Sequence, residues 1–206
     1  MKSILISINP QHALNILNGS KTLELRKSVP KDFIGWVYMY ITLGKKHEAL
    51  IDFSTFAFVK YNSRFHFVNL KNSTPLLQFR PVLNGKVVAR WWFDGYRKLQ
   101  YEDYIGDYIY GNMQLYEMKT FISNLCLTYD EIKDYGNEKD LYAWHINKLE
   151  IFDKPMWLSE FISHKIVENV CGSEEKWYQD TTDYFIIKNK GLTRPSQSWQ
   201  YVWVKE

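Results

Sequence analysis

Residues 19–27 read GSKTLELRK, and this stretch decides how the start of the chain folds. Leu23 and Leu25 alternate with polar neighbours, which is the period of a half-buried β-strand. The alternation turns both leucines towards a core and places Glu24 and Arg26 together on the opposite face. The stretch therefore predicts a strand with one apolar face and one charged face.

The residues before this stretch predict a strand and then a short helix. Residues 4–8 read ILISI, a short β-rich run that is typical of a buried strand. Asn9 fits an N-cap, and Pro10 fits the first helical position, where its missing N–H costs nothing. Gly19 fits the left-handed stop at the helix end. The chain is thus expected to open as strand, helix, strand.

Strand-like segments recur along the rest of the chain, with short helices between them. The predicted strands cover residues 36–41, 85–93, 141–152, 184–187 and 201–204, and the predicted helices cover 112–125 and 128–136. The strand 141–152 is expected to break at Asp153-Lys154-Pro155. Many strands of this length close into a barrel or packed sheets, because closure removes exposed edges. The predicted fold class is mainly β with short helices, an α+β arrangement.

Composition indicates one globular domain over residues 1–206. Hydrophobic residues make up 46% of the chain and charged residues 24%, a balance that disfavours disorder. No run approaches the roughly 20 apolar residues of a membrane-spanning helix, and no secretion signal is found. Cys126 and Cys171 lack metal-type spacing and are expected to be reduced thiols. The sequence therefore predicts a cytoplasmic protein without a metal, a cofactor or a membrane partner.

Charge is distributed unevenly along the chain. Residues 1–100 carry 15 Lys and Arg against 5 Asp and Glu, whereas residues 101–185 carry 7 against 17. The segment 186–206 is again basic, with 4 against 1. If the two basic segments meet, they form a face that attracts polyanions. If folding interleaves the charges instead, no such face exists.

Several blocks of sequence resemble the ASCH domain of the PUA-like superfamily, in its phage and bacterial branch. Residues 19–26 match that family's GxKTxExR signature in full. The later blocks that are similar to it are GKVV at 85–88, YAWHI at 142–146, FDKP at 152–155 and RPSQSWQYV at 194–202. The resemblance implies a PUA-like β-barrel with a cleft beside the first helix that receives RNA or a modified nucleoside. Residues 44–84 fall outside it and are expected to be an insertion or a diverged hairpin.

Lys21, Glu24 and Arg26 are the first candidate ligand-binding residues. Lys21 suits a phosphate or a polarised carbonyl, and Arg26 offers a planar fork for bidentate contacts. Glu24 could accept hydrogen bonds from the exocyclic amine of a base. The pattern alone favours the alternative of a partly exposed Glu24–Arg26 ion pair beside a solvated Lys21. The resemblance favours the binding interpretation.

The other candidate ligand-binding residues come from later blocks. His145 could contact a ligand or carry a proton, or could be a hydrogen-bonded wall residue. Arg90 and Arg194 could contact phosphate or lie in solvent. Gln197 and Ser198 suit the reading of a base edge, or a structural turn set by the preceding proline.

Two functions of different class follow from these residues. The leading hypothesis is a module that binds RNA or a nucleotide-like ligand, with a basic pocket for a base or phosphate. The alternative is a hydrolase of an N4-acylcytidine-type nucleoside, or a ribonuclease, with Lys21 and Glu24 as the catalytic pair. The amidohydrolase form of the family has threonine where this chain has Glu24, which leaves the question of an enzyme open. A protein partner on the acidic half is a third, unspecified possibility.

Overall fold

The computed structural model describes residues 1–43, 56–61, 64–69, 83–103, 105–109, 111, 114–164 and 191–204. Contacts along the backbone divide the chain into two compact units. The first unit comprises Met1–Leu14, Val37–Arg90 and Ile151–Glu206, and the second comprises Asn15–Trp36 and Trp91–Glu150. That these units form a single domain stays a prediction.

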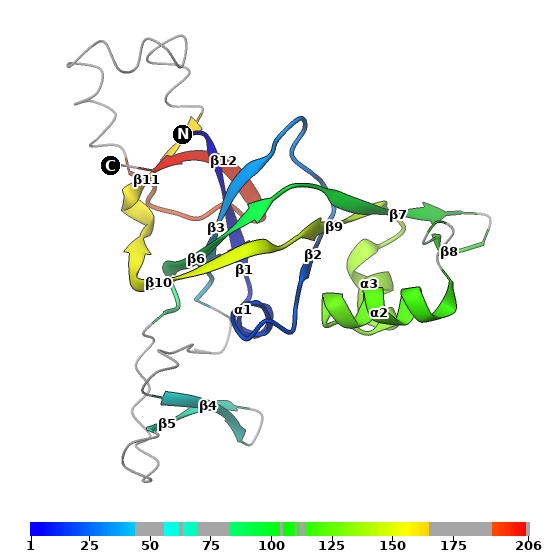
Figure 1. The fold of residues 1–206 in the computed structure, drawn as a ribbon, viewed down its shortest axis with the longest axis horizontal. Coiled ribbons are helices and arrows are strands. Elements are labelled where there is room, and N and C mark those ends of the chain that lie inside the picture. Colours follow the sequence, from blue (N-terminus) through cyan, green and yellow to red (C-terminus); the bar gives the residue numbers. More distant parts are fainter. Residues whose placement is uncertain are drawn as a thin grey trace. The chain divides into compact units, whose positions relative to one another are not determined.

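Strands dominate the described residues, and the predicted mainly-β class with short helices is confirmed (Figure 1). The elements in chain order are β1 (Ser3–Ile8), α1 (Pro10–Leu17), β2 (Leu23–Arg26), β3 (Gly35–Ile41), β4 (Phe56–Tyr61), β5 (Arg64–Asn69), β6 (Lys86–Phe93), β7 (Tyr96–Glu102), β8 (Asp107–Ile109), α2 (Leu115–Leu125), α3 (Tyr129–Gly136), β9 (Leu141–His145), β10 (Asn147–Trp157), the 3₁₀ turn η1 (Leu158–Glu160), β11 (Phe161–Ser163) and β12 (Trp199–Val204).

Most of the first unit's strands belong to a six-stranded mixed sheet in the order β10-β6-β3-β1-β12-β11. The β-rich run predicted at residues 4–8 is the core strand β1, which is buried along its whole length. β1 pairs in parallel with β3, with Ile4 opposite Val37, and antiparallel with β12. Because all six residues of β1 are buried, the side chains on both faces of this strand are enclosed, which explains its nearly continuous apolar sequence.

The helix after β1 follows the predicted local signals. The Asn9 side chain accepts a hydrogen bond from the Gln11 N–H at 3.1 Å, and the Asn9 carbonyl accepts from the Ala13 N–H at 2.9 Å. Gly19 ends the segment with φ +78°, a left-handed backbone conformation that residues with a side chain rarely adopt. The cap and the stop are confirmed.

The second unit contains a four-stranded sheet in the order β2-β9-β7-β8, with α2 and α3 packed on one face (Figure 1). The apolar residues of β2 lie on that face, as the alternation in GSKTLELRK predicts. This core is made of Leu23, Leu25, Leu99, Tyr108, Phe121, Leu125, Ile132, Leu141 and Ala143. The capping box of α3 is also confirmed, because the Thr128 hydroxyl accepts from the Glu131 N–H at 3.2 Å and Glu131 Oε2 accepts from the Thr128 N–H at 2.7 Å.

The predicted strand over residues 141–152 is wrong in two respects. It is divided at Ile146, whose N–H donates to the Thr22 carbonyl at 3.0 Å, into β9 of the smaller sheet and β10 of the larger one. The second part also continues through Pro155 to Trp157. Pro155 is tolerated because β10 is the end strand of its sheet, where a missing N–H breaks no ladder.

Closure into a barrel is not found among the described strands, which form open sheets of six, four and two strands. Within the predicted insertion at 44–84, β4 and β5 pair antiparallel, with Phe56 opposite Asn69. The predicted strand 184–187 and Cys171 lie outside the described residues. No helix in the described part of the chain is long and apolar enough to cross a membrane.

Candidate functional site

Lys21 lies directly before β2 and is enclosed by the second unit. Its side chain is 1% exposed, and its ammonium group donates a hydrogen bond to the carbonyl of Leu125, the last residue of α2. The Thr22 N–H donates to the neighbouring Asn124 carbonyl at 3.0 Å. Both groups satisfy carbonyls that the end of a helix leaves without partners, and the cation also complements the helix dipole. Lys21 thus joins the start of β2 to the end of α2.

Glu24 lies between two cations on the charged face of β2. One carboxylate oxygen is 3.5 Å from Lys21 Nζ, and the other is 3.0 Å from Arg26 Nη2. The side chains of Glu24 and Arg26 are 6% and 11% exposed. The Glu24–Arg26 ion pair is therefore present and largely buried, and the interpretation of a solvated Lys21 is wrong. The three residues form a buried ionic network, in which each charge depends on its partners to offset its desolvation.

Tyr135 extends this network to α3. The Arg26 guanidinium donates a hydrogen bond to the Tyr135 hydroxyl, and Lys27 Nζ lies 5.3 Å from the centre of the ring. Burial raises the pKa of the Tyr135 hydroxyl above its ordinary value, and the nearby Arg26 charge opposes that rise. The hydroxyl therefore stays protonated at neutral pH, and the network links β2 to both helices of the unit.

His145 lies on the other face of the same sheet, because it is paired with Leu23 across β2 and β9. Its Nδ1 is 3.1 Å from an Asp94 carboxylate oxygen, and the second oxygen accepts from the Asn147 amide at 2.6 Å. The His145 and Asp94 side chains are 35% and 44% exposed. Asp94 thus orients the imidazole while leaving it accessible.

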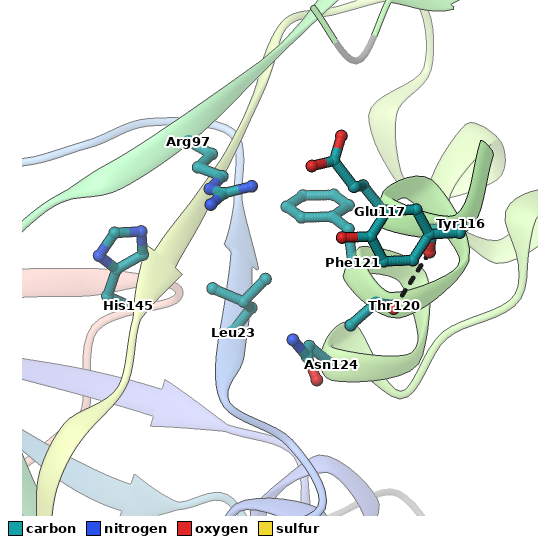
Figure 2. Close-up of a pocket in the computed structure, with 8 residues that line it drawn as sticks. All are labelled: Leu23, Arg97, Tyr116, Glu117, Thr120, Phe121, Asn124 and His145. Atoms are coloured by element: carbon teal, nitrogen blue, oxygen red, sulfur yellow. Dashed lines mark hydrogen bonds between the residues drawn. The ribbon is translucent and has the colours of Figure 1, made fainter. Parts of the chain in front are cut away.

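A cavity of about 270 Å³ opens on this face, between the sheet and α2 (Figure 2). The strands contribute an apolar residue, a cation and an imidazole, and the helix contributes two aromatic rings, a carboxylate, a hydroxyl and an amide. The lining residues are Leu23, Arg97, Tyr116, Glu117, Thr120, Phe121, Asn124 and His145. Phe121 and Leu23 are buried, so the inner surface is apolar and the rim is polar. This combination is typical of small-ligand sites.

The structure separates the predicted residues of the second unit into two groups. His145 lines the cavity. Lys21, Glu24 and Arg26 are not among its lining residues, and the register shows why for two of them. Glu24 lies opposite Trp144 and Arg26 opposite Tyr142, so both share the sheet face that His145 does not.

The predicted residues of the first unit have local roles of their own. Arg90 donates to the Tyr38 hydroxyl at 3.3 Å. The turn that holds Gln197 and Ser198 is bound to β1, since the Ser7 N–H donates to the Ser198 carbonyl at 2.8 Å. Arg194 and Gln197 are exposed. That these groups contact a ligand stays a prediction.

Sequence reasoning missed most of the cavity's polar residues, although one signal was present. Tyr116, Thr120 and Asn124 are four residues apart, so they share one face of α2. Nothing in the sequence singled out Arg97. Its position two residues before the core residue Leu99 does not distinguish it from a solvent-exposed arginine on any strand. Among the described residues, no group of three or more His, Cys, Asp or Glu side chains could hold a metal ion.

Comparisons with known proteins give structural similarity only. No family model matches the sequence, and no curated protein matches it. The crystal structure of ASCH from Zymomonas mobilis is similar at 13% identity and a TM-score of 0.48, over 97% of this chain and 86% of that one. A mutant of the same protein matches at 14% identity and a TM-score of 0.45, over 98% of this chain and 90% of that one.

Proposed function

We propose that this chain binds RNA or a nucleotide-like ligand, and that the cavity of the second unit receives one base or nucleotide. The observation that carries the proposal is that a cation without a partner among the described residues and an exposed aromatic ring line the same cavity. Among the described residues, nothing pairs with the Arg97 side chain, and Tyr116 is 71% exposed at the cavity's edge. A large exposed ring and an available guanidinium are the groups that hold unstacked bases and phosphates.

The lining of the cavity suits a small polar ligand, and its volume limits what can be enclosed. A volume of about 270 Å³ lies just below the range of about 300–1,000 Å³ typical of small-molecule sites. Thr120, Asn124 and His145 provide hydrogen-bonding groups around the apolar inner surface. Single-stranded RNA presents its bases in this unpaired form, and the ASCH resemblance implies an RNA or nucleoside ligand. A cytoplasmic location is part of the same proposal.

The buried network of Lys21, Glu24 and Arg26 joins the elements that form the cavity. Lys21, Glu24 and Arg26 connect β2 to α2 and α3, and α2 provides most of the cavity's polar groups. In this proposal their main contribution is to hold the helix against the sheet. Direct contact between these three residues and the ligand stays a prediction.

Hydrolysis of a modified nucleoside or of RNA is the second candidate function, and the Asp94–His145 pair favours it. A histidine oriented by a carboxylate at the edge of a cavity is a geometry suited to proton transfer. Lys21 is a weaker choice for the catalytic base, because its amine is enclosed and already donates to a backbone carbonyl. Turnover of N4-acetylcytidine or of single-stranded RNA, abolished in the His145→Ala variant, would establish this activity.

The binding proposal is tested with single-stranded RNA oligonucleotides and the four ribonucleoside monophosphates. We expect Arg97→Ala to weaken binding about 10-fold, since hydrogen bonds to charged groups contribute roughly 1.5–3 kcal/mol. Lys119→Ala is the matched control, because Lys119 is exposed on the same helix and does not line the cavity. Absence of binding by the unaltered chain, or equal losses in both variants, would overturn the proposal.

A further inference from the structure

The cavity holds two opposite charges that do not pair with each other. Figure 2 shows the Arg97 guanidinium, from β7, and the Glu117 carboxylate, from α2, directed to the same space beside the Phe121 ring. No ion pair joins them among the described residues. A ligand in this space would therefore meet a donor fork on one side and an acceptor on the other.

The Glu117 carboxylate is held in place by the helix to which it belongs. Glu117 is the third residue of α2, and its Oε2 accepts a hydrogen bond from the Gln114 N–H at 2.8 Å as part of a capping box. This bond fixes the side chain and leaves the other oxygen available to a ligand. The acceptor side of the cavity is thus preorganised, which lowers the entropy cost of binding.

We propose that the cavity selects bases that present an amine and a ring carbonyl on one hydrogen-bonding edge, namely cytosine and guanine. The inference rests on the proposed binding function and adds its specificity. Glu117 accepts from the exocyclic amine, as carboxylates do from the amine of cytosine, and Arg97 donates to the carbonyl side of the same edge. Tyr116 stacks on the face of the base, because its ring is exposed at the cavity and makes no ring contact among the described residues.

The other two common bases leave one of the two charged groups without a partner. Uracil has no amine, and its single ring N–H lies between two carbonyls, so a contact with the Glu117 carboxylate would also bring a carbonyl oxygen close to that negative charge. Adenine has an amine and no carbonyl, so its edge offers the Arg97 fork a single ring nitrogen. A site built for a given hydrogen bond discriminates against a ligand that cannot make it, because its own polar group is left unpaired.

The experiment compares cytidine, guanosine, adenosine and uridine 5′-monophosphates on the full chain by calorimetric or fluorescence titration. We expect cytidine and guanosine monophosphates to bind about 10-fold more tightly than the other two, the discrimination of one good bidentate base contact. Inosine 5′-monophosphate, which is the guanine ligand without its amine, is expected to lose that advantage.

Glu117→Gln is the informative variant. Glutamine retains the capping box, so the helix is preserved, but its amide is both donor and acceptor and no longer rejects uracil. We expect the preference for cytidine over uridine monophosphate to fall to about 2-fold or less, against the roughly 10-fold of the unaltered chain. Lys119→Ala, outside the cavity on the same helix, is expected to keep the full preference.

The outcomes separate this inference from the proposal on which it rests. Equal affinity for the four nucleotides, or a preference unaffected by Glu117→Gln, overturns the specificity and leaves the binding function standing. Absence of binding to every nucleotide overturns both. A preference for cytidine and guanosine monophosphates that disappears in Glu117→Gln supports both.

Discussion

Glu24 and Arg97 lie on opposite faces of the four-stranded sheet, and their charged groups are in opposite states. On its face, Glu24 is enclosed together with Arg26 and with Lys21, which directly precedes the strand, and each of the three contacts an opposite charge. On the other face, Arg97 is exposed and, among the described residues, has no partner. Enclosed ions need each other to offset their loss of hydration, whereas an exposed and unpaired ion can form new bonds at little cost. Burial, rather than residue type, therefore distinguishes structural charges from charges available to a ligand.

Net charge does not distinguish the unit that contains the cavity either. The sequence of the second unit carries 10 Lys and Arg against 13 Asp and Glu, and that of the first carries 16 against 10. The unit that contains the cavity is thus slightly acidic. Attraction of an anionic group to this cavity must come from Arg97 locally, and we expect the salt dependence of nucleotide binding to be shallow.

Removal of Glu24 is expected to have the largest effect on stability. Glu24→Ala leaves two buried cations without their shared carboxylate, and losses of about 3–5 kcal/mol in the free energy of unfolding follow from such changes. Urea denaturation followed by tryptophan fluorescence measures the loss. Arg97→Ala, on the other face of the sheet, is the control and should change stability by no more than about 0.5 kcal/mol. Similar effects of the two variants would contradict the contrast between the faces.

Local signals in the sequence were sufficient for the opening of the chain. The Asn9 cap, Pro10 and the Gly19 stop defined α1, and the alternation of Leu23 and Leu25 gave the apolar face of β2. Each of these depends on residues within a few positions of one another, where propensity and capping act.

Features set by distant partners could not be predicted in this way. The carbonyl that receives Lys21 belongs to Leu125, 104 residues further on. Only the folded chain shows that the ammonium group of Lys21 binds a carbonyl at the end of α2. Likewise, Pro155 stays within a strand because β10 is at a sheet edge, a position that depends on strand order. The residues that line the cavity come from three strands and a helix, so no single segment of the sequence could predict it.

Loss of the Tyr116 ring is expected to affect binding and leave stability unchanged. Tyr116→Ala should weaken nucleotide binding about 10-fold, since stacking on an aromatic side chain contributes roughly 1–3 kcal/mol per base. Tyr116→Phe keeps the ring and should bind nearly as well as the unaltered chain. Titration with cytidine 5′-monophosphate, together with thermal unfolding, measures both quantities. An equal loss in Tyr116→Phe would mean that the hydroxyl, and not the ring, contacts the ligand.

The smallest expected effect comes from an exposed ion pair in the same unit. Lys98 Nζ lies 2.6 Å from Asp140 Oδ2, and the Tyr101 N–H donates to the other oxygen at 3.0 Å. The hydrogen bond from Lys98 is the main cause that lowers the pKa of the Asp140 carboxyl below its ordinary value. The pair therefore stabilises the fold above the unfolded-state pKa of about 3.9, and this contribution disappears as the pH falls through the lower, folded-state value.

Asp140→Asn tests this sign, because asparagine retains an acceptor for Tyr101 and removes the charge. We expect the variant to be slightly less stable than the unaltered chain at pH 7, and the difference to vanish well below pH 3.9. Both partners are more than a third exposed, so water screens the pair and the loss should be far smaller than that of Glu24→Ala. Unfolding free energies measured across this pH range decide the matter. A difference that is independent of pH would mean that packing or the Tyr101 hydrogen bond, and not the charge of Asp140, stabilises this edge of the sheet.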